Sequence, residues 1–134
     1  SNKLDYVYLV EGYMDVIGLY KNKIQNVVAN LGTALTSRQI SMLYQFFNKI
    51  IICFDGDESG YRAALRAAEN SIIELKPEKK ILFLFLPNNH DPDSYVNELG
   101  NDKFLEFSAQ NNIEIHKFIF NHYYKYNYQG WDYG

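Results

Sequence analysis

Six acidic side chains follow three apolar segments of the chain, at positions where strands are expected to end. They are Glu11 and Asp15 after residues 6–10, Asp55 and Asp57 after residues 50–54, and Asp91 and Asp93 after residues 81–86. Two unit charges about 4 Å apart repel by about 4 kcal/mol at an effective dielectric constant near 20. A cluster of such carboxylates therefore needs cations or protons, and we interpret it as a site for a hard divalent metal.

Magnesium fits this chemistry, because it binds through one or two carboxylates and keeps water and substrate phosphate as its other ligands. Two ions about 4 Å apart activate an attacking hydroxyl and stabilise a leaving oxygen, which predicts phosphodiester or nucleotidyl transfer. A lone Asp-x-Asp after a strand is more often a turn and a helix cap. The recurrence of acids after three segments favours the metal site over that structural alternative.

Apolar segments alternate with helical patterns, which indicates an α/β fold with a parallel sheet covered on both faces. Strands are predicted at residues 6–10, 26–29, 49–54 and 80–86, and helices at residues 13–21, 37–47 and 58–75. Ligands of such sheets bind beyond the carboxyl ends of the strands. A strand order of 2-1-3-4 would bring Glu11 next to Asp55 and Asp57.

The pattern changes after residue 89, where helices are predicted at 93–99, 102–110 and 114–124. The last two helices resemble the start of a helical neighbour, so the predicted division is residues 1–100 and residues 101–134. The tail from residue 123 is rich in Tyr, which could stack nucleic-acid bases. An orphaned helix end or a flexible tail is the favoured interpretation.

The composition, 47% apolar and 22% charged over 134 residues, predicts one globular domain. Neither a membrane helix nor a signal peptide is apparent, so no membrane partner is expected. Cys53 is the only cysteine and lies in an apolar strand, which predicts a buried thiol and a cytoplasmic protein. The first residue is not Met, and we expect the chain to be part of a longer protein.

The net charge of −3 argues against a broad basic surface that grips nucleic acid. Bound metal would reverse the local charge toward phosphate, so nucleic-acid chemistry remains possible. If the substrate is a polynucleotide, we expect most of the residues that bind its sugar-phosphate backbone to lie outside this chain.

Several short motifs occur in a fixed order along the chain. They are Val10-Glu11-Gly12-Tyr13-Met14-Asp15-Val16, then Ala29-Asn30-Leu31-Gly32-Thr33, then Phe54-Asp55-Gly56-Asp57 with Ser59-Gly60 and Ala63-Ala64, then Leu86-Pro87 with Asp91-Pro92-Asp93. Their order and spacing resemble the Toprim domain of bacterial DnaG-type DNA primases over about residues 5–99. The resemblance implies a Rossmann-like, mostly parallel sheet flanked by helices, followed by the start of a C-terminal helical subdomain.

The resemblance also implies a nucleotidyltransferase, a DNA primase that makes short RNA primers on single-stranded DNA from nucleoside triphosphates during replication. By motif match, the catalytic residues are Glu11, Asp55 and Asp57, and the metal ligands are Glu11, Asp15, Asp55, Asp57, Asp91 and Asp93. The metal is Mg²⁺, with Mn²⁺ as a substitute. Glu11 comes singly from its strand and is the better candidate for proton handling, whereas Asp55 and Asp57 form a pair suited to chelation.

Members of the resembled family carry a zinc-binding module, a basic half of the polymerase core and a domain that binds the replicative helicase. None of these is found in this sequence, so we expect the chain alone to be weakly active or inactive. Gly12, Gly56 and Gly60 are expected to let the backbone turn tightly and approach phosphate. The loop at Gly32-Thr33 either borders the nucleotide or forms a simple helix-entry turn.

Three alternatives remain open. Another Toprim enzyme, a topoisomerase or a nuclease, would use the same acids. The topoisomerase motif typically continues with Arg-Glu-Gly-Glu, where this chain has Glu58-Ser59-Gly60-Tyr61. A phosphatase of the haloacid dehalogenase class would form an aspartyl-phosphate after a similar strand. A non-enzymatic, receiver-like domain would use the metal only to hold its loops.

Overall fold

A computed structural model describes residues 5–30 and 35–132, with side chains as far as residue 125. The elements in chain order are β1 (Tyr6–Val10), α1 (Tyr13–Lys21), β2 (Val27–Ala29), α2 (Ser37–Tyr44), β3 (Lys49–Phe54), α3 (Glu58–Ser71), the 3-10 helix η1 (Ile72–Glu74), β4 (Lys80–Phe85), α4 (Pro92–Leu99), α5 (Asn101–Asn111), β5 (Ile113–Glu114) and α6 (Ile115–Asp132). The loop at Gly32-Thr33 lies outside the described residues.

The strands form one sheet in the order β2-β1-β3-β4-β5. The first four strands are parallel, with Leu9 opposite Ile52 and Phe54 opposite Phe85, whereas β5 runs antiparallel to β4. The predicted order 2-1-3-4 is confirmed, and β5 was not predicted. The carboxyl ends of β1, β3 and β4 therefore lie along one edge of the sheet.

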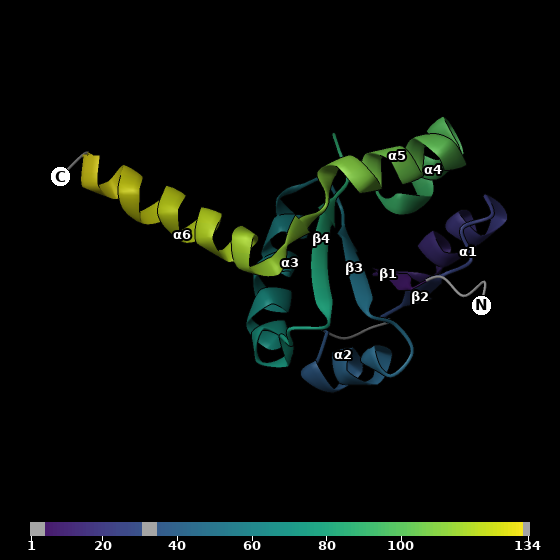
Figure 1. Ribbon diagram of the computed structural model, residues 1–134. Helices are drawn as coiled ribbons and strands as arrows, with labels where there is room; N and C mark the ends of the chain where they lie inside the picture. The colour runs from purple at the N-terminus through teal and green to yellow at the C-terminus, as the bar shows by residue number, and fades with distance from the viewer. Residues whose placement is uncertain (1–4, 31–34, 133–134) are drawn as a thin grey trace.

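Helices cover both faces of the sheet, because successive residues of a strand point to opposite faces and both sets are apolar (Figure 1). On one face, Ile50 and Ile52 pack with apolar residues of α2, α3 and the first turn of α6. On the other face, Ile51 and Cys53 pack with residues of α1, α4 and α5. The predicted burial of Cys53 is confirmed.

The helix boundaries follow local hydrogen bonds. Thr36 and Gln39 form a capping box at the start of α2, so Thr36 is its N-cap residue. The predicted helices over residues 37–47 and 58–75 are too long, since α2 stops at Tyr44 and the regular helix of α3 stops at Ser71. The amino group of Lys79 bonds to the carbonyl of Tyr44 at 2.8 Å, which satisfies an acceptor that the end of α2 leaves free.

The C-terminal segment belongs partly to the same core. The ring of Phe104 on α5 lies 5.4 Å from that of Tyr8, whose hydroxyl bonds to Ser108 at 2.9 Å. The division after residue 100 stays a prediction, and this packing favours grouping α5 with the sheet. Helix α6 extends away from the sheet and includes the Tyr-rich tail as far as Asp132 (Figure 1). Within the described residues, no helix is long and apolar enough to span a membrane.

Candidate metal centre at the carboxyl edge of the sheet

Glu11 and Asp55 follow directly on the neighbouring strands β1 and β3. The register that pairs Leu9 with Ile52 brings the ends of the two strands to the same edge. Neither carboxylate accepts a hydrogen bond from the described residues, and the charge of Glu11 acts directly on Asp55. The structure thus brings together two predicted site residues that are 44 positions apart in the sequence.

Asp57 lies in the turn between β3 and α3 and caps that helix. Its Oδ1 accepts the backbone N–H of Gly60 at 2.7 Å. A Cβ atom at Gly56 would overlap the carbonyl oxygen of Leu86, and one at Gly60 would overlap that of Asp55. These two glycines accommodate the chain's own backbone, which differs from the expected approach to phosphate.

Asp91 occupies the equivalent position before α4. Its Oδ1 accepts the N–H of Ser94 at 2.7 Å, and the hydroxyl of Ser94 accepts the N–H of Asp91 in return. The peptide N–H of Gly56 bonds to the carbonyl of His90 at 3.0 Å, and that of Asn89 bonds to the carbonyl of Gly56 at 3.0 Å. The turns that carry Asp55 and Asp91 are therefore joined by backbone hydrogen bonds.

Asp15 and Asp93 interact with each other across two helices. The Oδ1 of Asp15 accepts the backbone N–H of Asp93 at 3.0 Å, and Asp15 is buried. The Oδ1 of Asp93 accepts a hydrogen bond from the amide of Asn97 at 2.6 Å. Both carboxylates thus accept hydrogen bonds from the protein, unlike Glu11 and Asp55.

Three carboxyl groups at this edge have a raised pKa, and burial is the largest cause for each. The pKa of Asp55 is raised to about 6, first by burial and then by the negative charge of Glu11. Burial and the carboxylates of Asp15 and Asp57 raise the pKa of Glu11. Burial also raises the pKa of Asp15 to about 6. Negative charge has accumulated here without enough positive charge to balance it.

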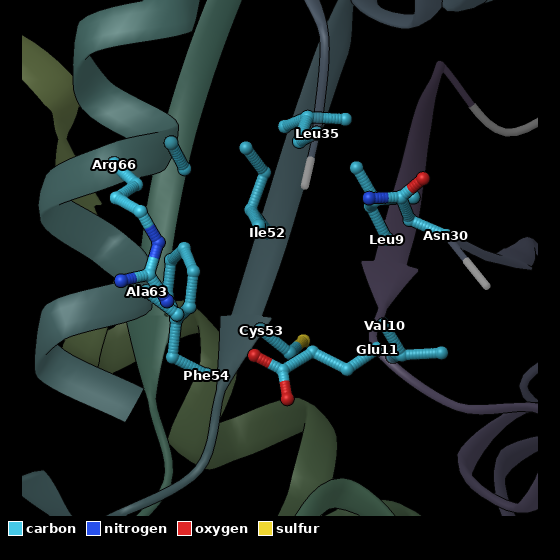
Figure 2. Close-up of a pocket in the computed structure, with 11 residues that line it drawn as sticks. Leu9, Val10, Glu11, Asn30, Leu35, Ile52, Cys53, Phe54, Ala63 and Arg66 are labelled. Atoms are coloured by element: carbon cyan, nitrogen blue, oxygen red, sulfur yellow. The ribbon is translucent and has the colours of Figure 1, made fainter. Parts of the chain in front are cut away.

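A pocket of about 400 Å³ adjoins Glu11 on the face covered by α2 and α3. Its floor is apolar, with Leu9 and Ile52 among the lining residues, and Asn30 and Arg66 add polar groups. Figure 2 shows the Glu11 carboxylate reaching from the end of β1 toward the end of β3, with Arg66 across the pocket on α3. The guanidinium of Arg66 is the charge that lowers the pKa of Glu11.

The sequence did not distinguish Arg66 from Arg62, which lies four residues earlier on the same helix. The structure does, because Arg62 is 3.9 Å from Glu58 whereas Arg66 lines the pocket. Asn30 was predicted only as part of a motif, although its position one residue after a predicted strand was a usable signal.

The donor set fits a divalent cation that keeps part of its hydration shell. Among the residues that the structure describes, no three His, Cys, Asp or Glu side chains converge closely enough to enclose an ion. Magnesium does not require such a cage, since one or two carboxylates with water and phosphate suffice. Glu11 and Asp55 supply oxygen donors that accept no hydrogen bond from the described residues, and burial followed by neighbouring carboxylates raises the pKa of both.

A family model described as the Toprim domain matches residues 5–85, which is more than half of the chain. The chain belongs to the Toprim domain family. The resemblance predicted from the motifs is thereby confirmed, and so is the α/β fold that it implied. The Toprim fold accounts for the acids at adjacent strand ends and argues against the phosphatase alternative.

Relatives of this Toprim domain include DNA primases. The chain is 47% identical over 116 residues to a DNA primase of Legionella pneumophila, covering 87% of this chain and 20% of that protein. A crystal structure of a DNA primase domain from Pseudomonas aeruginosa has a TM-score of 0.87 and 41% identity, with 90% of this chain and 38% of that chain covered. A DnaG primase catalytic domain bound to single-stranded DNA has a TM-score of 0.83 and 35% identity, with 89% and 37% covered. The chain thus spans about a fifth of the length of the curated relatives that it matches.

Proposed function

We propose that this Toprim domain is the metal-binding part of a DNA primase catalytic core. In this proposal the complete enzyme joins nucleoside triphosphates into short RNA primers on single-stranded DNA during replication. The names of the relatives support it, as does the similarity to a primase catalytic domain bound to single-stranded DNA. A primer-synthesising nucleotidyltransferase is therefore the function that we infer.

One observation carries the proposal. Glu11 and Asp55 stand at the ends of adjacent parallel strands, and burial together with the charge of Glu11 raises the pKa of Asp55. This arrangement is unfavourable for the domain by itself, since like charges that share a site oppose each other's ionisation. A group that destabilises the fold in this way commonly serves binding or catalysis.

The proposed ligands of Mg²⁺, or of Mn²⁺ as a substitute, are Glu11, Asp55 and Asp57, with Asp91 as an outer member. Asp57 uses only Oδ1 to cap α3, so Oδ2 is available to an ion. A bound cation supplies positive charge toward phosphate oxygens. Glu11 is in addition the proposed proton acceptor, because it comes singly from its own strand, whereas Asp55 and Asp57 form a pair suited to chelation.

The predictions that concern the complete enzyme remain proposals. They comprise the cytoplasmic location, the contact with the replicative helicase, the zinc-binding module and the main grip on the template. We assign the helicase and zinc functions to segments other than these 134 residues, since the chain covers about a fifth of its relatives. We expect the 134 residues to bind divalent metal without efficient primer synthesis.

The test replaces Asp55 by Asn in the complete primase polypeptide that carries this domain. We expect primer synthesis to fall at least about 100-fold, which corresponds to roughly 2.7 kcal/mol of lost transition-state stabilisation. The free energy of unfolding is expected to stay unchanged or to rise, because a repelled charge is removed. The matched control is Asp102→Asn, an exposed acid in the first turn of α5, which should leave priming intact. Full priming by the Asp55→Asn variant would refute the proposal.

A further inference from the structure

The first turn of α4 has an N–H group that its own capping residue does not reach. Helix N-termini leave their first backbone N–H groups without partners inside the helix. Pro92 opens α4 and has no N–H, and Asp91 accepts the N–H of Ser94. The N–H of Asp93 is the remaining donor of that turn, and Asp15 on α1 accepts it at 3.0 Å.

Asp15 therefore completes the cap of a helix 78 positions away in the sequence. Its side chain is only 8% exposed, although carboxylates are rarely buried without a partner. The partial positive charge at the start of a helix favours a carboxylate at this place. The bond thus gives a partner both to the buried carboxylate of Asp15 and to the N–H of Asp93.

The contact between α1 and α4 is close and polar beyond this bond. A Cβ atom at Gly18 would overlap the carboxylate of Asp93, so the small residue on α1 allows α4 to approach. The amide of Asn97 donates to Asp93 at 2.6 Å and its carbonyl accepts from Asn22 on α1 at 3.2 Å. Asp93 is thus directed toward α1 and its own helix.

We propose that Asp15 is a positioning residue that fixes the first turn of α4, and that Asp93 is its partner. Through this turn, Asp15 holds Asp91 and the backbone bond between His90 and Gly56 at the edge that carries Asp55. The inference deepens the proposed function, on which it rests, and it replaces the prediction that Asp15 and Asp93 bind the metal directly. In this proposal Asp15 serves as the hydrogen-bond acceptor for the first turn of α4, a role that an amide oxygen can also fill.

This distinction can be tested because Asn keeps an acceptor oxygen in place of the carboxylate, whereas Ala does not. We would prepare Asp15→Asn, Asp15→Ala and the control Asp102→Asn in the 134-residue chain. Binding of Mn²⁺ is measured by calorimetry, and hydrogen exchange of the Asp93 amide by NMR. Circular dichroism and thermal unfolding show whether each variant folds.

We expect Asp15→Asn to bind Mn²⁺ within about threefold of the wild type and to keep the Asp93 amide protected. Asp15→Ala should lose about 10- to 100-fold in affinity, the range typical of residues that orient metal ligands, with faster exchange of that amide. If Asp15→Ala does not fold, Asp15→Asn still decides the question. Loss of Mn²⁺ binding in a folded Asp15→Asn would identify Asp15 as a ligand and overturn the inference alone. Absence of Mn²⁺ binding by the wild type would instead refute the proposed metal site, and the inference with it.

Discussion

Two turns of the molecule place acids at neighbouring strand ends in different ways. The turn from β1 to α1 carries Glu11, and a Cβ atom at its N-cap residue Gly12 would make only an ordinary contact, with the carboxylate of Asp15. The turn from β3 to α3 carries Asp55 and is closely packed, with Asp57 as a cap and no room for a Cβ atom at Gly56. The turn after β3 is therefore closely packed, whereas the turn after β1 is less so.

The difference suits the two proposed roles. A chelating pair benefits from a backbone that its surroundings hold in one conformation, because its ligands are then positioned before the metal arrives. A residue that accepts a proton from the substrate must be able to extend toward it, and the side chain of Glu11 is one methylene longer than that of Asp55. The two turns therefore predict different responses to the same substitutions.

The largest expected difference lies between Gly56→Ala and Gly12→Ala. The first variant forces a methyl group against the carbonyl of Leu86, and we expect it to lose about 3 kcal/mol of unfolding free energy or more. The second variant has room for its methyl group, and we expect a loss below about 1 kcal/mol. Urea unfolding of both variants checks this. Equal losses would show that the two turns are packed alike.

A smaller expected effect distinguishes the capping hydrogen bond of Asp57 from the role of its negative charge. Asp57→Ala removes the acceptor for the N–H of Gly60 and should cost about 1 kcal/mol of unfolding free energy. Asp57→Asn keeps an equally good cap and should unfold like the wild type, while its affinity for Mn²⁺ falls as in Asp57→Ala. Thermal unfolding and calorimetry on the same samples measure both quantities. Equal destabilisation by the two variants would argue that the charge, and not the cap, holds the turn.

The smallest effect concerns pH. The folded-state pKa of Asp55 is raised to about 6, above the value near 4 of an unfolded chain, so the folded state binds more protons between these values. Its contribution to stability therefore declines as the pH rises from about 4 to 6. We expect Asp55→Asn to show a weaker decline in urea unfolding across this range, and Mg²⁺ to stabilise the wild type more at pH 7 than at pH 5. Identical pH profiles of the two proteins would contradict the raised pKa.

Most of the sheet and its order were predictable from the sequence. Long apolar strands such as β3 and β4 are buried on both faces, and their composition alone distinguishes them from surface strands. The motif order then predicted a Toprim fold, which the family match confirms. The acids followed from the same pattern, because parallel strands end at one edge.

Other features were not predictable for physical reasons. Strand β5 has two residues, too few for any periodicity, and it forms because the free edge of β4 lies beside it. The carbonyl of Tyr44 at the end of α2 accepts a hydrogen bond from Lys79, which is 35 positions away. The fit of Gly56 against Leu86 likewise depends on two segments that meet only in the folded chain.

By itself, the sequence determined which residues carry charge and at which strand ends they stand, since hydrophobic burial fixes the strands and a parallel sheet fixes their direction. Only the tertiary structure decided which of those acids accept hydrogen bonds from the protein and which do not. Glu11 and Asp55 accept no hydrogen bond from the described residues, whereas Asp15 accepts a backbone N–H from α4. The physical reason is that a carboxylate's partner is a matter of distance in space, and the chain brings together N–H and oxygen atoms that are 78 positions apart only when it folds.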